Sequence, residues 1–372
     1  MKKIIVHVAS HYPPYMGGLE IVAKSSADLM AKMGYKVRVI TTDKGIDKSA
    51  VLSKDNPQVT YMKSFEFAHT PFAPALLWNL LKLPKNSIIH LHLAQAYFPE
   101  LVLIASKVRG IPYIAHFHLD VEQSGFFGPL FVIYKKIFWK RILGSAKKVI
   151  VCSSDQKLVV QKKFGVKANK IVVIPNGVSD SFFSGKKYKP SAKAARLLYV
   201  GRLTVQKRVE RLIETVSLLN IPVNLKIIGD GEDRSKLEDL AKSLNLTNIS
   251  FEGGKSPDQI KKHLKDSDIF LLSSDKEGGT PLVALEAMAS KLPVIATNVS
   301  GVRDLLKNTG ILVDKPYSKS FAREIEKLWK DKGRLIKLSD LSVKKAEGYR
   351  WSVFAQNLDK VYKDVSVGDN LS

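Results

Sequence analysis

The chain has 372 residues, enough for two domains of ordinary size that each bury their own core. Its content of 45% hydrophobic and 25% charged residues is typical of a globular protein, and its single cysteine, Cys152, excludes an intrachain disulfide framework and a cysteine-based zinc site. The 59 lysines and arginines exceed the 35 acidic residues, and the net charge of +24 favours polyanionic partners such as nucleic acid, anionic lipid or phosphorylated substrates.

The N-terminus predicts a strand, a glycine loop, a helix and a second strand. Residues 3–9 form an apolar strand, residues 19–33 an amphipathic helix and residues 37–41 another strand. This βαβ opening predicts a parallel, doubly wound α/β sheet. Gly17 and Gly18 lie where the loop enters the helix, so they form either a plain tight turn or an anion-binding helix start.

Polar side chains follow two later strands of the same sheet. Short apolar runs predict these further strands at residues 59–62, 87–91, 112–115, 148–152 and 171–174. His90 and His92 alternate at the end of one strand. His116, His118 and Asp120 come at the end of the next, and the carboxyl ends of strands are where open α/β sheets bind ligands. A metal site would need a third ligand beside His90 and His92, and the adjacent sequence supplies none.

A polar, lysine-rich stretch at residues 183–195 contains glycine and proline and is typical of an interdomain linker. A second α/β domain is predicted to follow, with strands at residues 196–201, 223–228, 249–252, 269–272, 294–296 and 311–313. Asp266 and Asp268 form a D-x-D triplet between a helix and a strand. We interpret this triplet as a structural turn and expect no metal there.

Two cations follow the first strand of this second domain. Arg202 and Lys207 lie in G-R-L-T-V-Q-K, directly after that predicted strand. Arg208 and Arg211 begin the next predicted helix, at residues 208–219, and are interpreted as solvated.

The sequence from Ser273 to Asn298 predicts a strand, a glycine loop, a helix and a strand. Gly278 and Gly279 allow a tight loop, and Thr280 followed by proline resembles an N-cap with proline at the first helical position. Unpaired N–H groups at such a helix start suit a phosphate. Glu286 lies inside the helix, where its carboxylate would accept hydrogen bonds from sugar hydroxyls. A nucleotide sugar is the ligand that needs both features.

Residues 126–148 combine aromatic side chains with many basic ones, and a helix is predicted from Pro129. Its basic residues include Lys135, Lys136, Lys140 and Arg141. The segment is either an ordinary packing helix with a solvated basic face or a helix that lies in a membrane interface. The net charge of +24 favours docking on an anionic membrane surface.

The run E-G-G-T-P-L-V-A-L-E-A-M-A resembles the motif of the group 1 (family 4) retaining glycosyltransferases with the GT-B fold. The G-G-L-E loop, H-F-H-L-D, G-R-L-T-V-Q-K and the tryptophan before the last helix resemble other segments of that family, in the same order. The family's two glutamates are separated by seven residues, whereas eight separate Glu277 from Glu286 here. Glu286 therefore matches the second glutamate, and either Glu277 or Gly278 fills the first position.

This resemblance implies two facing Rossmann-like, doubly wound domains with the active site in the interdomain cleft. Residues 1–182 would bind the acceptor, residues 196–350 would bind the nucleotide sugar, and a C-terminal helix at 351–372 would cross back onto the first domain. The implied reaction moves a hexosyl unit from a nucleoside diphosphate sugar to a hydroxyl with retention of configuration. No cofactor or metal is expected, and no paired glycosidase carboxylates are needed.

The resemblance also implies roles for individual residues. Those implied to be catalytic are His118, Arg202, Lys207 and Glu277. Those implied to bind the donor are Gly17, Gly18, Arg202, Lys207, Gly254, Lys255, Gly278, Gly279, Thr280, Pro281, Leu282 and Glu286. Those implied to contact the acceptor or the transferred sugar are Glu20, His116 and Asp120. Either His116 or His118 matches the family's sugar-contacting histidine, and the aspartate two residues further on favours His118.

The expected acceptor is a glycan or a lipid-linked saccharide, in the synthesis of lipid-linked glycan, glycolipid or cell-surface polysaccharide. The expected location is cytoplasmic and peripheral, on the inner face of the membrane. A nucleotide-sugar epimerase or a phosphorylase of the same fold would share these sites. A nucleic-acid-binding protein would explain the charge, but the basic residues are dispersed and no recognised nucleic-acid module is present.

Overall fold

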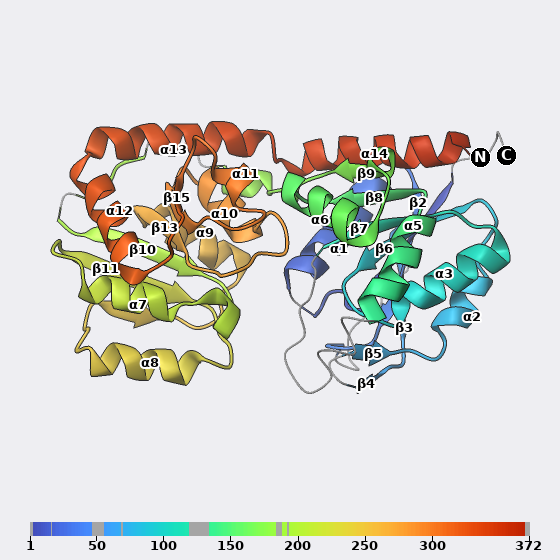
Figure 1. Ribbon diagram of the computed structural model, residues 1–372, viewed down its shortest axis with the longest axis horizontal. Helices are drawn as coiled ribbons and strands as arrows, with labels where there is room; N and C mark the ends of the chain where they lie inside the picture. The colour runs from blue at the N-terminus through green and yellow to red at the C-terminus, as the bar shows by residue number, and fades with distance from the viewer. Residues whose placement is uncertain are drawn as a thin grey trace. The chain divides into compact units, whose positions relative to one another are not determined.

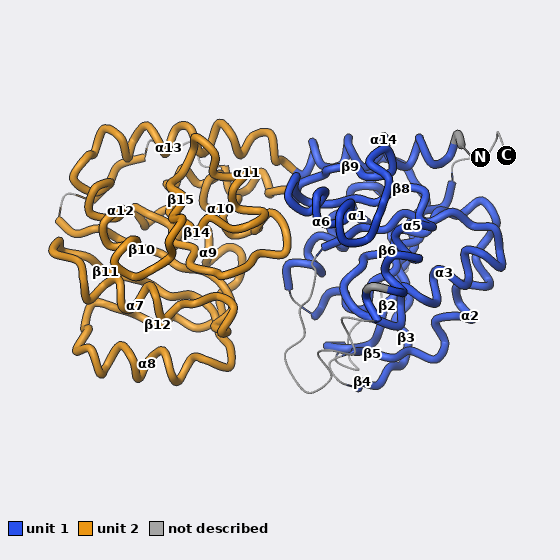
Figure 2. Tube along the Cα trace, viewed as in Figure 1, with its two compact units in different colours: residues 1–176, 351–372 blue, residues 177–350 orange. Residues whose placement is uncertain are grey.

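The chain divides into two compact units. The computed structural model describes residues 3–15, 17–46, 56–67, 70–118, 134–183, 188–191 and 193–368. One unit comprises residues 1–176 with 351–372, and the other comprises residues 177–350 (Figure 1, Figure 2). Each unit has its own parallel sheet, which confirms the predicted α/β class with two Rossmann-like domains.

Seven strands form the sheet of the first unit, in the order β3-β2-β1-β6-β7-β8-β9. Their bounds are β1 Ile4–Val8, β2 Lys36–Thr42, β3 Gln58–Met62, β6 Ser87–Leu93, β7 Tyr113–Phe117, β8 Lys148–Val151 and β9 Ile171–Val173. All neighbouring pairs are parallel. The strand order reverses between β1 and β6, and open α/β sheets bind ligands at the carboxyl ends beside such a reversal.

The other elements of the first unit include a short hairpin that the sequence did not predict. The helices of the first unit are α1 Gly18–Lys32, α2 Leu76–Leu81, α3 Phe98–Arg109, α5 Lys140–Ser145, α6 Ser154–Phe164 and α14 Trp351–Gly368, with a π-helical turn at Lys135–Trp139 and a 3₁₀ turn at Ala168–Lys170. The hairpin pairs β4 Phe65–Phe67 with β5 Thr70–Phe72. Helix α14 belongs to this unit although it ends the chain, and the Tyr35 hydroxyl donates a hydrogen bond to Asp359 Oδ1 on it, at 2.7 Å.

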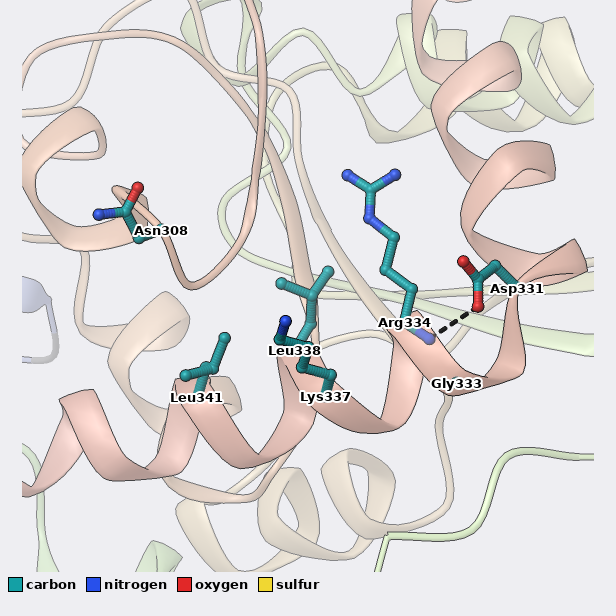
Figure 3. Close-up of a pocket in the computed structure, with 7 residues that line it drawn as sticks. All are labelled: Asn308, Asp331, Gly333, Arg334, Lys337, Leu338 and Leu341. Atoms are coloured by element: carbon teal, nitrogen blue, oxygen red, sulfur yellow. Dashed lines mark hydrogen bonds between the residues drawn. The ribbon is translucent and has the colours of Figure 1, made fainter.

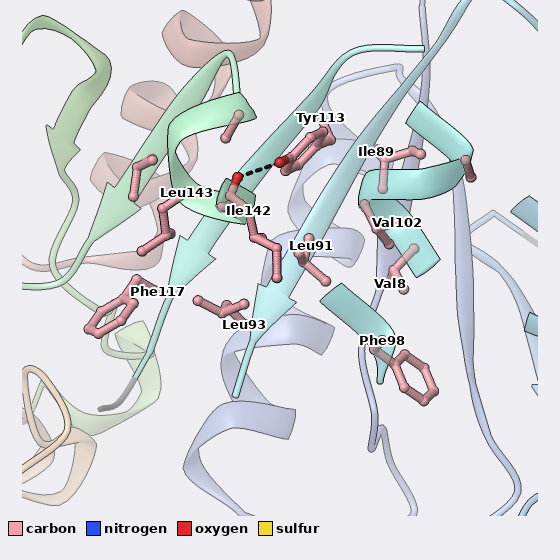
Figure 4. Packing of buried hydrophobic residues seen from close by; sticks show 14 of the residues in the cluster. Val8, Ile89, Leu91, Leu93, Phe98, Val102, Tyr113, Phe117, Ile142 and Leu143 are labelled. Carbon is pink, nitrogen blue, oxygen red and sulfur yellow. Dashed lines mark hydrogen bonds between the residues drawn. The ribbon is translucent and has the colours of Figure 1, made fainter. Parts of the chain in front are cut away.

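Three central strands carry the core of the first unit. Every residue of β1, β6 and β7 is buried, which explains why these strands carry apolar residues on both faces. Figure 4 shows Val8, Leu91 and Phe117 among the buried side chains. Trp139 packs edge-on against Phe117, with ring centroids 5.8 Å apart. This contact packs Trp139 against the carboxyl end of β7.

The second unit has six strands in the order β12-β11-β10-β13-β14-β15, again all parallel. The strands are β10 Ala195–Val200, β11 Val223–Ile228, β12 Ile249–Phe251, β13 Ile269–Leu272, β14 Val294–Thr297 and β15 Ile311–Val313. The helices are α7 Glu210–Ser217, α8 Arg234–Ser243, α9 Pro257–Lys265, α10 Leu282–Ala289, α11 Arg303–Leu306, α12 Ser318–Lys330 and α13 Lys332–Glu347, with 3₁₀ turns at Asp180–Phe182 and Val205–Lys207. The order reverses between β10 and β13.

The boundary between the units lies at residues 176 and 177, whereas the sequence placed the end of the first domain at 182. Val178 N donates to Tyr349 O at 2.7 Å, and Phe182 is buried in a core cluster of the second unit. In the stretch predicted as a linker, the Tyr188 hydroxyl donates to Asp268 O at 2.7 Å. The described part of this stretch therefore packs on the second unit.

The basic aromatic segment is described from residue 134 onward, so Pro129 and the residues around it lie outside the described part. Lys135, which was expected to belong to an exposed basic face, is instead 4% exposed and lies over the Trp139 ring, 4.9 Å from the centroid. Lys140 and Arg141 are exposed, as are Ile137 and Phe138. Among the described residues, no helix has both the length and the apolar character required to cross a bilayer.

Candidate active site

Two loops of the second unit meet beside the reversal in its strand order. One loop follows β10 and carries Lys207, and the other follows β13 and carries Glu277. Lys207 Nζ lies 2.7 Å from Glu277 Oε1, and the two side chains are 18% and 8% exposed. Glu277, one of the two candidates for the position that the motif spacing left open, is therefore paired with the predicted cation.

Further hydrogen bonds tie the same two loops together. Ser273 Oγ donates to Lys207 O at 2.8 Å, and Asp275 N donates to Gln206 O at 3.0 Å. Gln206 Nε2 donates to Lys276 O at 2.8 Å. The Lys207–Glu277 pair is thus held by a network that the local sequence could not indicate, because its partners are about 70 residues apart.

Arg208 and Arg211, which were interpreted as solvated, both form ion pairs with Asp275. Arg208 Nε lies 2.5 Å from Asp275 Oδ2, and Arg211 lies 2.6 Å from Asp275 Oδ1. Arg208 also has a positive φ of 52, which explains why α7 begins at Glu210 rather than at residue 208. Both arginines fasten the Glu277 loop. Arg202 itself is exposed, and its carbonyl accepts a hydrogen bond from the Tyr199 hydroxyl at 3.0 Å.

Helix α10 starts one residue later than the sequence predicted. Pro281, not Thr280, is the N-cap, because its ψ of 122 is extended and the first helical residue is Leu282. The prediction of Thr280 as the cap is therefore wrong. The first N–H groups of α10 still lack intrahelical acceptors, so this terminus keeps the partial positive charge that suits a phosphate.

Glu286 lies in the second turn of α10 and is half-buried. Burial raises the pKa of its carboxyl to about 7, and Lys261 opposes that shift. Within the described part of the chain, its side chain has no hydrogen bond or ion pair. A carboxylate in this position is available to accept hydrogen bonds from a ligand.

Glycines let four backbone segments approach closely around these loops. A Cβ on Gly229 would lie 1.8 Å from Gly201 O, and one on Gly301 would lie 2.1 Å from Gly279 O. Gly231 is packed in the same way on Leu203 O. Gly301 supports the predicted donor loop from another segment and was not among the predicted site residues. Its only local signal is a glycine beside a strand end.

The loop after β12 contains the two residues expected to hold the nucleobase. Gly253 has a φ of 69, and its carbonyl accepts a hydrogen bond from Gly229 N at 2.9 Å. Gly254 is exposed, with open space where a Cβ would be, and Lys255 forms an ion pair with Glu252 at 3.7 Å. This loop is therefore joined by its backbone to the loop after β11.

The D-x-D triplet is built into the sheet of the second unit. Asp268 is fully buried and accepts hydrogen bonds from Arg196 Nε at 3.0 Å and from Ser191 N at 2.9 Å. Asp266 is the C-cap of α9. Both carboxylate oxygens of Asp268 are engaged with Arg196, which matches the geometry of a structural tie.

In the first unit, a carboxylate already lies at the start of α1. Gly17 is the N-cap, with extended φ of −170, and a Cβ placed there would lie 2.3 Å from Glu20 Oε2. Glu20 is buried, and Gly18 has open space around it. A phosphate at this terminus would have to displace the Glu20 carboxylate.

Five buried histidines gather on one face of β1, β6 and β7. The adjacent sequence supplies no third ligand beside His90 and His92, but other strands bring further histidines close to them. The fold brings His7 to one side of them and His116 and His118 to the other. Neighbouring strands place alternate residues on the same face, so the partners come from across the sheet. Asp120 lies outside the described residues.

A cavity of about 560 Å³ lies along α13, away from these residues (Figure 3). Its lining consists of Asn308, Asp331, Gly333, Arg334, Lys337, Leu338 and Leu341. Asp331 accepts a hydrogen bond from Arg334 N at 2.8 Å. None of the predicted site residues lines it.

Family models match both halves of the chain. "Glycosyltransferase Family 4" matches residues 16–182, and "Glycosyl transferases group 1" matches residues 181–346. An uncharacterised glycosyltransferase of Methanocaldococcus jannaschii is 28% identical over 392 residues, which cover 96% of this chain and 97% of the relative. UDP-Gal:alpha-D-GlcNAc-diphosphoundecaprenol alpha-1,3-galactosyltransferase of Escherichia coli is 27% identical over 386 residues, which cover 95% of each chain.

Solved structures show the same fold. Anabaena Alr3699/HepE in complex with UDP and glucose superposes with a TM-score of 0.78 at 18% identity, over 97% of this chain and 100% of that one. The lipopolysaccharide outer core galactosyltransferase WaaB superposes with a TM-score of 0.72 at 21% identity, over 99% of each chain. With the family models and the two parallel sheets, these similarities show that the chain belongs to the group 1 (family 4) glycosyltransferases and has the GT-B fold.

Proposed function

We propose that this glycosyltransferase moves a hexosyl unit from a nucleoside diphosphate sugar to an acceptor hydroxyl with retention of configuration. The observation that carries the proposal is the Lys207–Glu277 pair, joined to the loop that leads into α10, where Glu286 has no partner among the described residues. The Escherichia coli relative is named for a UDP-galactose donor, and the HepE structure holds UDP and glucose, which supports a nucleotide-sugar donor.

Each part of the second-unit site has a chemical role in this proposal. The N-terminus of α10 and the loop at Gly278 and Gly279 bind the diphosphate through backbone N–H groups. Arg202 and Lys207 stabilise the charge that develops as the diphosphate leaves. Glu286 accepts hydrogen bonds from the sugar hydroxyls. The bond from C1 to the diphosphate breaks while the acceptor oxygen bonds to C1 from the same face, and a phosphate oxygen takes the acceptor proton.

A direct assay tests this reaction and its metal requirement. Nucleotide sugars that protect the protein against thermal unfolding are incubated with and without candidate saccharide acceptors, in EDTA and with added Mg²⁺ or Mn²⁺. We expect nucleoside diphosphate release only with an acceptor, at the same rate in EDTA, because Arg202, Lys207 and the helix terminus supply the positive charge. Release without an acceptor, an inverted product by NMR, or activity restored only by metal would each contradict part of the proposal.

Donor affinity is expected to rise with pH through the titration of Glu286. Burial raises the pKa of this carboxyl to about 7, so it is protonated below that pH and accepts hydrogen bonds fully only above it. We expect the dissociation constant for the donor to fall about five- to tenfold from pH 6 to pH 8, the difference between a neutral and a charged hydrogen bond. Isothermal titration calorimetry of wild type and Glu286→Gln measures this difference.

The Glu286→Gln variant should bind the donor with an affinity that does not change over the same pH range. The raised pKa has a second consequence, because the carboxyl holds its proton more tightly in the folded state. The unliganded wild type should lose stability as pH rises from about 4.5 toward about 7, and the variant should lose less. A pH profile that is identical in both proteins would contradict the role of Glu286.

The acceptor is proposed to be lipid-linked, with the protein docked on an anionic membrane from the cytoplasm. Ile137, Phe138, Lys140 and Arg141 are exposed together on the described part of the basic aromatic segment. Basic residues near an anionic surface contribute about 1 kcal/mol each, so reversing two of them should lower vesicle binding more than tenfold. Flotation of Lys140→Glu/Arg141→Glu with anionic vesicles measures this loss.

The matched control for the membrane test is Lys315→Glu/Lys319→Glu, which makes the same charge change at exposed residues of the second unit. We expect the control to float like the wild type. Lys135 is left unchanged because it is buried against Trp139. Equal recovery of the wild type on neutral and anionic vesicles would contradict membrane docking and favour a soluble acceptor.

A further inference from the structure

The five buried histidines form two separate hydrogen-bonded chains. In the first chain, His7 Nδ1 lies 3.0 Å from His92 Nε2, and His92 Nδ1 lies 2.9 Å from His118 Nε2. His7 and His92 are almost fully buried, and His118 is 8% exposed at the carboxyl end of β7. The chain therefore runs from the centre of the sheet to the edge where ligands bind in this fold.

The second chain shares no hydrogen bond with the first one. His90 Nδ1 lies 2.5 Å from the Tyr362 hydroxyl, and His90 Nε2 lies 3.2 Å from His116 Nδ1. His116 Nε2 then lies 3.9 Å from Cys152 Sγ. Although the His116 and His118 rings stack with centroids 4.1 Å apart, their hydrogen-bonding nitrogens belong to different chains.

All three rings of the first chain are neutral at physiological pH. Burial lowers the pKa of His7 and of His118 to about 3, and burial with the neighbouring histidines holds the pKa of His92 well below its usual value. A neutral imidazole has one N–H donor and one acceptor nitrogen. The middle ring, His92, must therefore donate one hydrogen bond and accept the other. Both hydrogen bonds of the chain then run the same way, either inward toward His7 or outward toward His118.

The unpaired atom at the inner end of the chain selects the direction. His7 Nε2 is buried without a hydrogen-bond partner in the described part of the protein. If the chain pointed inward, this atom would be a buried N–H with no acceptor, which is the rarer and costlier defect. If the chain points outward, the same atom is only an unused lone pair. The outward direction places the proton of His118 on Nδ1.

We propose that His92 and His7 are positioning residues that hold His118 in its Nδ1–H tautomer, so that Nδ1–H donates a hydrogen bond to a hydroxyl oxygen of the transferred sugar. This inference rests on the proposed function, in which His118 contacts the sugar. His118 Nδ1 has no hydrogen bond among the described residues, so its donor is available. A neutral donor of fixed direction binds an oxygen and does not compete for its proton.

The same histidines lie close enough together to bind a metal ion, and charge argues against that use. Both ring nitrogens of His92 are already in hydrogen bonds, as are both of His90. The other hydrogen-bond partners of these rings among the described residues are a tyrosine and a cysteine, and burial raises the pKa of that Cys152 thiol to about 12. No negative charge in these contacts would balance a buried divalent cation.

The test uses two substitutions at His92, each of which retains the hydrogen bond of only one ring nitrogen. An asparagine amide can replace Nδ1 and still donate to His118, whereas a glutamine amide can replace Nε2 and reaches only toward His7. In histidine-labelled protein, ¹⁵N NMR should show His118 as the Nδ1–H tautomer in wild type and in His92→Asn. His92→Gln should show a mixture of tautomers. With the nucleotide sugar and acceptor identified by the release assay, kcat should fall about 10- to 100-fold in His92→Gln and less than threefold in His92→Asn.

A matched control lies two residues away on the same strand. His90→Gln changes an equally buried histidine of the other chain, so the tautomer of His118 should be unchanged. The inference would be overturned if His118 were the Nε2–H tautomer in wild type, or if its tautomer did not change in His92→Gln. It would also be overturned if titration with Co²⁺ gave the d–d absorption of a tetrahedral site. The NMR measurement needs no substrate. If the tautomers follow the expectation and His118→Ala keeps full activity, the proposed sugar contact fails rather than the positioning.

Discussion

Lys207→Ala is expected to lower kcat about 10²- to 10³-fold, the usual loss when one preorganised group that stabilises developing charge is removed. In the wild type, Lys207 Nζ lies 2.7 Å from Glu277 Oε1 and both side chains are mostly shielded from water. The position of the ammonium group is therefore fixed before the donor binds. The loss should be in kcat more than in KM, because the charge on the diphosphate increases as it leaves. Steady-state kinetics with the identified donor measures both terms.

Glu277→Ala should cost about as much as Lys207→Ala, because the ammonium loses the group that orients it. Glu277→Gln should lose only about tenfold, since an amide oxygen can still accept from Lys207 Nζ. The double variant Lys207→Ala/Glu277→Ala should be little worse than either single variant, because residues that act as a unit are not additive. Additive losses would mean that the two side chains have independent roles.

Arg208→Ala is the matched control, because Arg208 joins the same two loops through Asp275. That pair is exposed, with side chains 37% and 42% accessible, and exposed pairs contribute about 0–1 kcal/mol to stability. Arg208→Ala should therefore change kcat less than threefold. A loss as large as that of Lys207→Ala would show that the loops need only be tied together and that Lys207 has no special chemical role.

The sequence predicted the parts of the site that depend on local pattern. Glu286 was identified correctly as a residue of the helix that follows the glycine loop, because helix phase is set within a few residues. Pairing across the sheet is different. Lys207 and Glu277 meet because β10 and β13 are neighbours at the reversal of strand order, and no short window of sequence contains that order.

The histidine chains show the same limit more strongly. His90 and His92 could be assigned to one face of one strand by their alternation. Their contact with His7 depends on the register in which His7 is paired with His90 across β1 and β6. A shift of one residue in that register would turn His7 to the opposite face. Register is set by the packing of the whole sheet, so His7 was not identified as a partner.

The basic segment was misread because its helix does not keep one period. The residues from Lys135 to Trp139 form a π-helical turn, and α5 follows at once. A π-turn advances the chain by less than 100° per residue, so side chains predicted from an α-helical period fall on the wrong face. Lys135 consequently lies in the core over Trp139, while Ile137 and Phe138 are exposed.

Gly301→Ala is expected to lower kcat/KM about 10²-fold without contacting the donor. A Cβ on Gly301 would lie 2.1 Å from Gly279 O, and a φ of 83 is unfavourable for alanine. The Gly279 loop must therefore move, and a displacement of about 1 Å in a substrate-positioning group costs about 10²-fold. The second unit should also unfold at a temperature lower by about 4 °C or more.

Two further variants separate the contact with Gly279 from strain and from general effects of alanine. Gly301→Asn tolerates a positive φ but carries the same Cβ, so it should fail as badly as Gly301→Ala if the contact dominates. Gly348→Ala is the control in the same unit, because its φ is −69 and the nearest atom to a Cβ there is Lys345 O at 3.5 Å. We expect it to bind the donor like the wild type in calorimetry. If Gly301→Ala also binds the donor with wild-type affinity, the Gly279 loop does not hold the diphosphate and the donor site must lie elsewhere on the second unit.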